Sequence, residues 1–101
     1  MIENPEELQK AVERLHKCAA QFIEAVEIEE TFQGQTVWQG IVHVFEIAGN
    51  PKATGCYAWS SPIEGSTKRK FVAVLHAPPV ASARDAVRAA VVQEYREGHT
   101  L

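Results

Sequence analysis

Residues 36–47, with the sequence TVWQGIVHVFEI, limit the fold of this chain more than any other stretch. β-Branched and aromatic residues favour a long strand here, and successive side chains of a strand point to opposite faces of a sheet. One face would carry Val37, Gln39, Ile41, His43, Phe45 and Ile47, and the other would carry Thr36, Trp38, Gly40, Val42, Val44 and Glu46. Both faces are largely apolar, so both need cover. Helices can cover one face, and the sequence therefore predicts a further contact surface on the other.

The stretches on either side predict one α+β domain over residues 1–101, with the element order α-β-β-β-β-α. The predicted strands cover residues 26–32, 36–47, 53–60 and 71–76, with one helix before them and one after them. Short links between strands favour an antiparallel meander. Two helices pack most simply on one face of such a four-stranded antiparallel sheet, which leaves the other face open.

Local signals mark the ends of the two predicted helices. Apolar residues recur every three or four positions from Leu8 to Val26, which predicts a first helix that begins near residue 5 and ends within residues 20–26. Ser82 and Asp85 have the spacing of a capping box, so the last helix should begin directly after Ser82.

The predicted open face carries aromatic residues. Tyr57 and Trp59 lie two apart on the third strand and therefore share a face, which Trp38 of the neighbouring strand can join. Such a cluster fits a core under a helix, a subunit interface, or a site for flat or cationic ligands. Because large open apolar patches are unusual on monomers, we expect a homodimer that associates through this face. His43 and His76 would supply polar contacts at its edge.

A small enzyme or small-molecule-binding protein is the alternative hypothesis, with a site at the sheet rim around His43, Tyr57 and His76. Ionisable side chains on apolar strands tend to have shifted pKa values, so His43, His76, Cys56 or Glu46 could act as base or nucleophile. No local nucleophile signature accompanies Cys56, which favours a buried, inert thiol. We therefore favour a non-catalytic binding or interaction module.

The charge balance argues against nucleic acid as a partner. The 101 residues carry a formal net charge of −3, whereas binding driven by phosphate contacts needs a basic surface. Residues 68–70, KRK, together with Arg84 and Arg88 could still contact an anion, although a solvated basic face is the simpler interpretation.

The cysteines and the first residues suggest a compartment. Cys18 and Cys56 do not form a disulfide framework, and the chain has no close metal-ligand pair such as C-x-x-C. The first ten residues, MIENPEELQK, lack the apolar core of a secretory signal, and no apolar run approaches the length of a membrane span. We expect a reduced cytoplasmic protein with no cofactor and no metal.

Three motifs carry a resemblance to a known group of proteins. They are W-x-G-x-V-x-V-F at residues 38–45, CYAWS at residues 56–60, and VLH-x-PPV followed by AVRA within residues 74–89. In these motifs the chain resembles a family of small, uncharacterised bacterial α+β proteins, similar to the orphan proteins of mobile elements such as integron gene cassettes. The resemblance covers about two-thirds of the chain and leaves out the first helix. It implies a compact protein that is often oligomeric, with no known activity.

Overall fold

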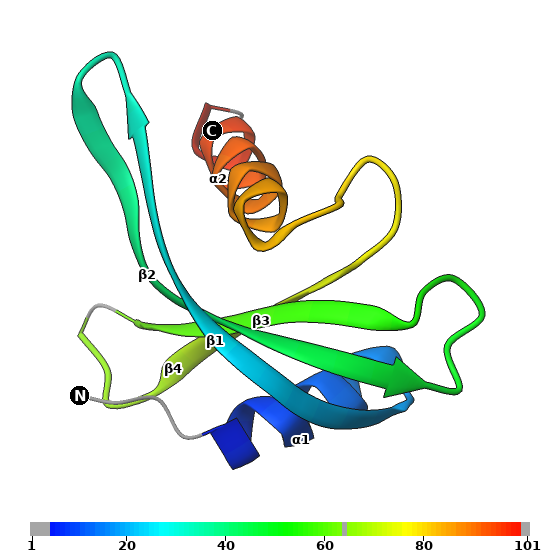
Figure 1. Ribbon diagram of the computed structural model, residues 1–101. Coiled ribbons are helices and arrows are strands. Elements are labelled where there is room, and N and C mark those ends of the chain that lie inside the picture. Colours follow the sequence, from blue (N-terminus) through cyan, green and yellow to red (C-terminus); the bar gives the residue numbers. More distant parts are fainter. Residues whose placement is uncertain (1–4, 64, 100–101) are drawn as a thin grey trace.

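The computed structural model describes residues 5–63 and 65–99 (Figure 1). Its elements are α1 (Pro5–His16), β1 (Ala19–Phe32), β2 (Gln35–Ala48), β3 (Gly55–Pro62), β4 (Arg69–Leu75) and α2 (Ala83–His99). The strands form one antiparallel sheet in the order β1-β2-β3-β4. The predicted α+β class, element order and antiparallel meander are therefore confirmed.

β1 and β2 form a hairpin that is much longer than β3 and β4. The two strands pair along their whole length, and Gly34 in their turn has a φ of +79°, which glycine adopts without steric cost. β3 pairs with β2 over residues 43–46 alone. The outer part of the hairpin, residues 26–42, therefore extends beyond the rest of the sheet, and we call it the hairpin arm. Figure 1 shows the arm rising beside α2.

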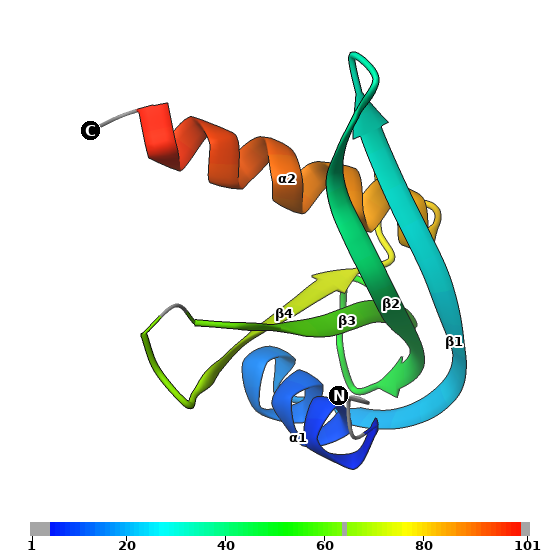
Figure 2. The same cartoon turned by 90° about the vertical axis from the view of Figure 1, so that its left-hand side faces the viewer.

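α1 and α2 lie on opposite faces of the sheet (Figures 1 and 2). One buried cluster joins Leu8 and Val12 of α1 to Phe45, Ile47, Cys56 and Ala58, and another joins Ala86 and Val87 of α2 to Ile28, Val42, Tyr57 and Trp59. The prediction of two helices on one face with an open face behind them was therefore wrong. Both faces of β2 and β3 are apolar, and each face is removed from water by its own helix.

The first helix ends earlier than its apolar periodicity suggested. It stops at His16, Lys17 has a left-handed φ of 51°, and the chain is paired with β2 from Ala19 onward. An apolar run of this length fits a helix or a strand when read alone. Pairing with β2 settled the choice, because it satisfies the backbone hydrogen-bonding groups of β1 and buries Ala20 against the α1 side of the sheet.

The start of α2 follows its predicted capping residues. The backbone N–H of Asp85 donates to Ser82 Oγ at 3.1 Å, and the backbone N–H of Ala81 donates to Asp85 Oδ2 at 3.1 Å. These two bonds satisfy backbone donors that lie at and before the first turn of the helix. The helix therefore starts at a defined point, which places its apolar stripe over Tyr57 and Trp59.

Candidate functional site

The aromatic residues of the predicted open face lie in the core under α2. Trp59 is 3% exposed and Tyr57 is 8% exposed, and both belong to the cluster that contains Val87. Trp38, which pairs with Glu30 in the middle of the hairpin arm, packs against Trp59 with a ring-centroid distance of 5.5 Å and an interplanar angle of 69°. No partner can reach the Trp59 ring while α2 covers it.

Trp38 depends on a glycine that lies two residues further along β2. A Cβ atom on Gly40 would meet the Trp38 ring at 3.1 Å, closer than nearly all real contacts of this kind. The indole therefore lies flat along the strand, over the position where another residue would have a side chain. It packs against the core under α2 and is only half-buried.

His43 lies on the face opposite to Tyr57 and does not join the predicted rim site. It is 5% exposed, and its ring lies 5.7 Å from the ring of Phe22 on the α1 side of the sheet. β2 alternates, so His43 shares a face with Phe45 and not with Val44, which packs on the α2 side. The structure therefore separates His43 from Tyr57 and His76.

Tyr57 and His76 do come together. The Tyr57 hydroxyl lies 2.6 Å from His76 Nδ1, and the two rings are 5.7 Å apart. Burial raises the pKa of Tyr57, and the negative charge of Asp85 and the Cys56 thiol raise it further. The phenol therefore keeps its proton and can donate it to Nδ1, an arrangement that orients the exposed imidazole. Within the described part of the chain, no third side chain hydrogen-bonds to this pair.

The remaining chemical candidates are not in a reactive setting. Cys56 is fully buried, and burial raises the pKa of its thiol to about 12. Burial also raises the pKa of Cys18, with a further contribution from the charge of Glu13. A thiol with a raised pKa is a poor nucleophile near neutral pH. Glu46 is exposed at the end of the β2 segment that pairs with β3.

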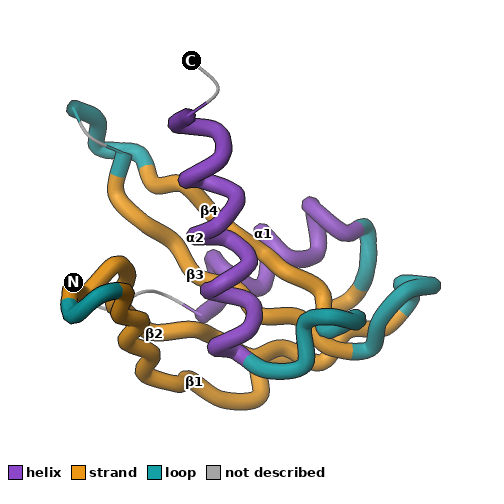
Figure 3. The backbone as a smooth tube through the Cα atoms, turned by 90° about the horizontal axis from the view of Figure 1, so that it is seen from above, coloured by secondary structure: helices purple, strands orange, loops and turns teal. Residues whose placement is uncertain are grey.

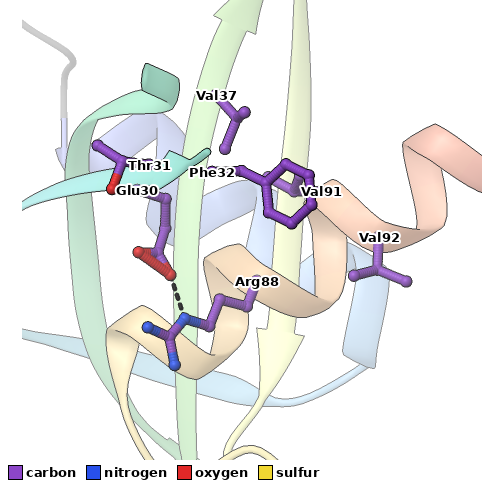
Figure 4. Close-up of a pocket in the computed structure, with 7 residues that line it drawn as sticks. All are labelled: Glu30, Thr31, Phe32, Val37, Arg88, Val91 and Val92. Atoms are coloured by element: carbon purple, nitrogen blue, oxygen red, sulfur yellow. Dashed lines mark hydrogen bonds and ion pairs between the residues drawn. The ribbon is translucent and has the colours of Figure 1, made fainter. Parts of the chain in front are cut away.

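An apolar groove separates the hairpin arm from the second half of α2 (Figure 4). Its volume is about 720 Å³, and it is lined by Glu30, Thr31, Phe32, Val37, Arg88, Val91 and Val92. Three of its apolar side chains are strongly exposed: Phe32 at 66%, Val37 at 46% and Val92 at 48%. Sequence patterns did not single out this groove, because its two walls come from segments that are distant in the chain.

A buried carboxylate lies at one end of the groove. Glu30 is 6% exposed and forms ion pairs with Arg84, at 2.7 Å, and with Arg88, whose Nε donates to the other carboxylate oxygen (Figure 4). The hydrogen bond from Arg88 lowers the pKa of Glu30, burial opposes this shift, and Arg84 lowers the pKa further. Arg84 also donates to the backbone oxygen of Glu29 at 3.0 Å.

This cluster changes the interpretation of three residues. Glu30 interrupts the apolar alternation of its strand, a pattern typical of a solvated strand edge, yet its side chain points inward to two arginines of α2. Arg84 and Arg88, which could have served with residues 68–70 as an anion contact, are instead held by Glu30. The hairpin arm and α2 are therefore joined by charge at one end of the groove and separated by apolar surface along the rest of it.

Two further properties describe the part of the chain that the structure covers. Within it, no group of three or more His, Cys, Asp or Glu side chains is arranged to hold a metal ion. Neither described helix combines the length and the apolar character needed to cross a membrane. No protein family, curated protein or solved structure matches this chain.

Proposed function

We propose that this protein is a non-catalytic interaction module whose docking surface is the groove between the hairpin arm and α2. The observation that carries the proposal is the exposure of Phe32, Val37 and Val92 on facing walls of one groove. Full burial of a side chain of this kind stabilises a complex by roughly 1.5–3 kcal/mol, so a surface that leaves several of them in water favours a partner that covers them.

The shape and the lining of the groove support binding. A volume of about 720 Å³ falls within the range of known ligand sites, and most of its lining is apolar. The Glu30–Arg88 pair adds a fixed polar group at one end, which can set the orientation of a partner. Both walls belong to regular elements, β1 and β2 on one side and α2 on the other, so the groove does not depend on a loop for its shape.

The chemistry of the other candidate residues supports a non-catalytic role. Tyr57 and His76 form a pair without a nucleophile, and the Cys56 thiol is buried with a raised pKa. His43 is held on the opposite face of the sheet, away from that pair. General acid–base or nucleophilic catalysis needs such groups to converge on one reacting atom. The enzyme hypothesis therefore has less support than a docking surface.

A neutral, environment-sensitive dye tests the groove directly. We expect Nile red to fluoresce on binding to dilute wild-type protein and to lose most of that signal with the Val92→Gln variant. The matched control is Leu15→Gln on α1, because Leu15 is equally exposed, at 51%, but lies on the other side of the sheet. Glutamine is a good helix former, so neither variant should disturb its helix.

The outcome of the dye experiment separates groove binding from general stickiness. A signal lost in Val92→Gln and kept in Leu15→Gln supports the docking surface. Equal signals from the wild type and both variants, or no signal at all, would remove the groove from consideration.

A further inference from the structure

The outer half of β2 has a backbone edge without a strand beside it. β2 pairs with β1 along its whole length, but β3 pairs with β2 only over residues 43–46. Among the described strands, residues 35–42 therefore have a neighbour on one side only. Alternate N–H and C=O groups on the other side are left to water, and such a row is a template for an additional strand.

The charges of the two edges of the hairpin arm differ sharply. Within the arm, β1 on one edge carries the exposed Glu27 and Glu29. Residues 35–42 on the other edge, QTVWQGIV, contain no charged side chain. Charges on an edge strand prevent pairing between copies, and an uncharged edge permits it. The β1 edge is therefore protected against a second copy of the chain, and the β2 edge is not.

α2 provides a support for a strand beside β2. Figures 2 and 3 show the second half of α2 continuing past the hairpin arm, on the side to which the β2 edge faces. Val91 and Val92 lie on this part of the helix. No described strand covers Val92, which is 48% exposed. A strand added to β2 would lie over these residues and fill the groove. The same position thus offers both backbone partners and an apolar surface.

We infer that the occupant of the groove is a second copy of this chain, which pairs its own residues 35–42 antiparallel with residues 35–42 of the first. This inference rests on the proposed function, since it names the partner of the same groove. A segment that pairs with itself in antiparallel orientation is compatible with a two-fold axis, so each copy gives and receives the same contacts. The product is a continuous sheet through two hairpin arms, covered by α2 of both copies. The recognition mode is the addition of a strand to a sheet edge.

Light scattering over a concentration series, combined with amide hydrogen exchange, tests this assembly. We expect a monomer–dimer equilibrium, with amide exchange in residues 35–42 slowing as the dimer forms and exchange in β1 unchanged. The residue-level protection identifies the edge that pairs, which mass alone does not.

A charge placed on the β2 edge provides a variant that leaves the groove lining intact. Ile41 is 43% exposed and does not line the groove, so Ile41→Lys puts a charge on the otherwise uncharged β2 edge of each copy without changing the groove lining. We expect the dissociation constant of the dimer to rise about tenfold or more. The matched control is Ala25→Lys, an exposed position on β1 directly next to the arm, which should dimerise as the wild type does. Equal thermal midpoints of the two variants at low concentration would show that both fold.

Each result separates the inference from the proposed function. The inference is supported if the protein dimerises and the amides of residues 35–42 are protected from exchange in the dimer. Ile41→Lys should then weaken the dimer, and Ala25→Lys should leave it unchanged. A monomer at every concentration that still binds Nile red in the groove overturns the inference and leaves the docking surface standing. A dimer with protection in β1 or α1 overturns it as well. A monomer whose dye signal is indifferent to Val92→Gln would remove both.

Discussion

Glu30 stands in a run of acidic residues that resembles a solvated strand edge when the sequence is read alone. In the folded chain its carboxylate is 6% exposed and is held by two arginines from α2, whereas the adjacent Glu29 is exposed and accepts a bond from Thr36. The difference arises because neighbouring residues of a strand face opposite sides of the sheet. A single side chain thus acquires its role from the helix that arrives opposite to it.

The Glu30 cluster should make the stability of the fold depend on acidic pH. Its two arginines lower the pKa of Glu30 in the folded chain. The ion pairs therefore stabilise the fold fully above pH 4.5, the usual pKa of a glutamate. This stabilisation is lost as the pH falls through the lowered pKa of Glu30. Glu30→Gln should therefore lower the thermal midpoint at pH 7, and the difference from the wild type should shrink in acid. Thermal denaturation between pH 7 and pH 3 measures this.

Glu29→Gln is the control for the pH experiment, since it removes the same charge from the exposed neighbour. We expect it to leave both the midpoint at pH 7 and its pH dependence nearly unchanged. If the thermal midpoints of Glu30→Gln and Glu29→Gln changed with pH in the same way, the pH dependence could not be assigned to the buried ion pairs of Glu30.

The two thiols should differ in reactivity. Cys56 is completely buried with a pKa of about 12, and Cys18 is half-buried with a pKa that is raised by burial and by Glu13. At pH 8 we expect a thiol reagent to label Cys18 slowly and Cys56 only after the protein unfolds. Mass spectrometry after timed alkylation, with and without denaturant, gives the site and the rate. Rapid native labelling of Cys56 would revive the nucleophile hypothesis.

At the scale of the element, β2 shows what periodicity can and cannot predict. Its length and its two apolar faces were evident in residues 36–47, and the observed strand is Gln35–Ala48. The end of the first helix was not evident, because Ala19 and Phe22 continue the helical spacing of the preceding residues although they belong to β1. Hydrogen bonds to a distant segment decided between them, and those bonds have no local signal.

The third strand carries a large buried side chain, Trp59. Trp59 is 3% exposed between α2 and Trp38, so Trp59→Ala should destabilise the monomer fold by about 3–5 kcal/mol. This loss is one of core packing and not of subunit contact. Urea denaturation at fixed protein concentration measures it. If Trp59→Ala kept the stability of the monomer and only dissociated a dimer, the result would contradict the buried position of Trp59. It would support the subunit interface that the sequence first suggested for this residue.

At the scale of the whole molecule, the sheet separates two cores. Leu8 of α1 and Val87 of α2 are completely or almost completely buried, but they belong to different clusters on opposite faces. Leu8→Ala and Val87→Ala should each cost roughly 2–4 kcal/mol. Because the two sites share no side-chain contacts, their effects should add to within about 0.5 kcal/mol in the double variant.

A double-mutant cycle by urea denaturation tests the separation of the cores. Leu8→Ala combined with Phe45→Leu is a suitable comparison, because both residues lie in the α1 cluster. We expect coupling within that pair and none between the two faces. Strong coupling between Leu8 and Val87 would mean that the two helices share one core. That is the arrangement expected from the sequence, with both helices on one face of the sheet.

Several properties of this protein follow from the sequence by itself. The alternation of apolar residues determined the strands and their order, the Ser82–Asp85 spacing determined the start of α2, and short links determined the meander, because each depends on residues close together in the chain. The tertiary structure alone decided which face each helix covers, that Glu30 meets Arg84 and Arg88, and that a groove opens between the hairpin arm and α2. The Glu30 contacts and the groove join segments more than fifty residues apart. Their energies depend on three-dimensional contact, which sequence spacing does not encode.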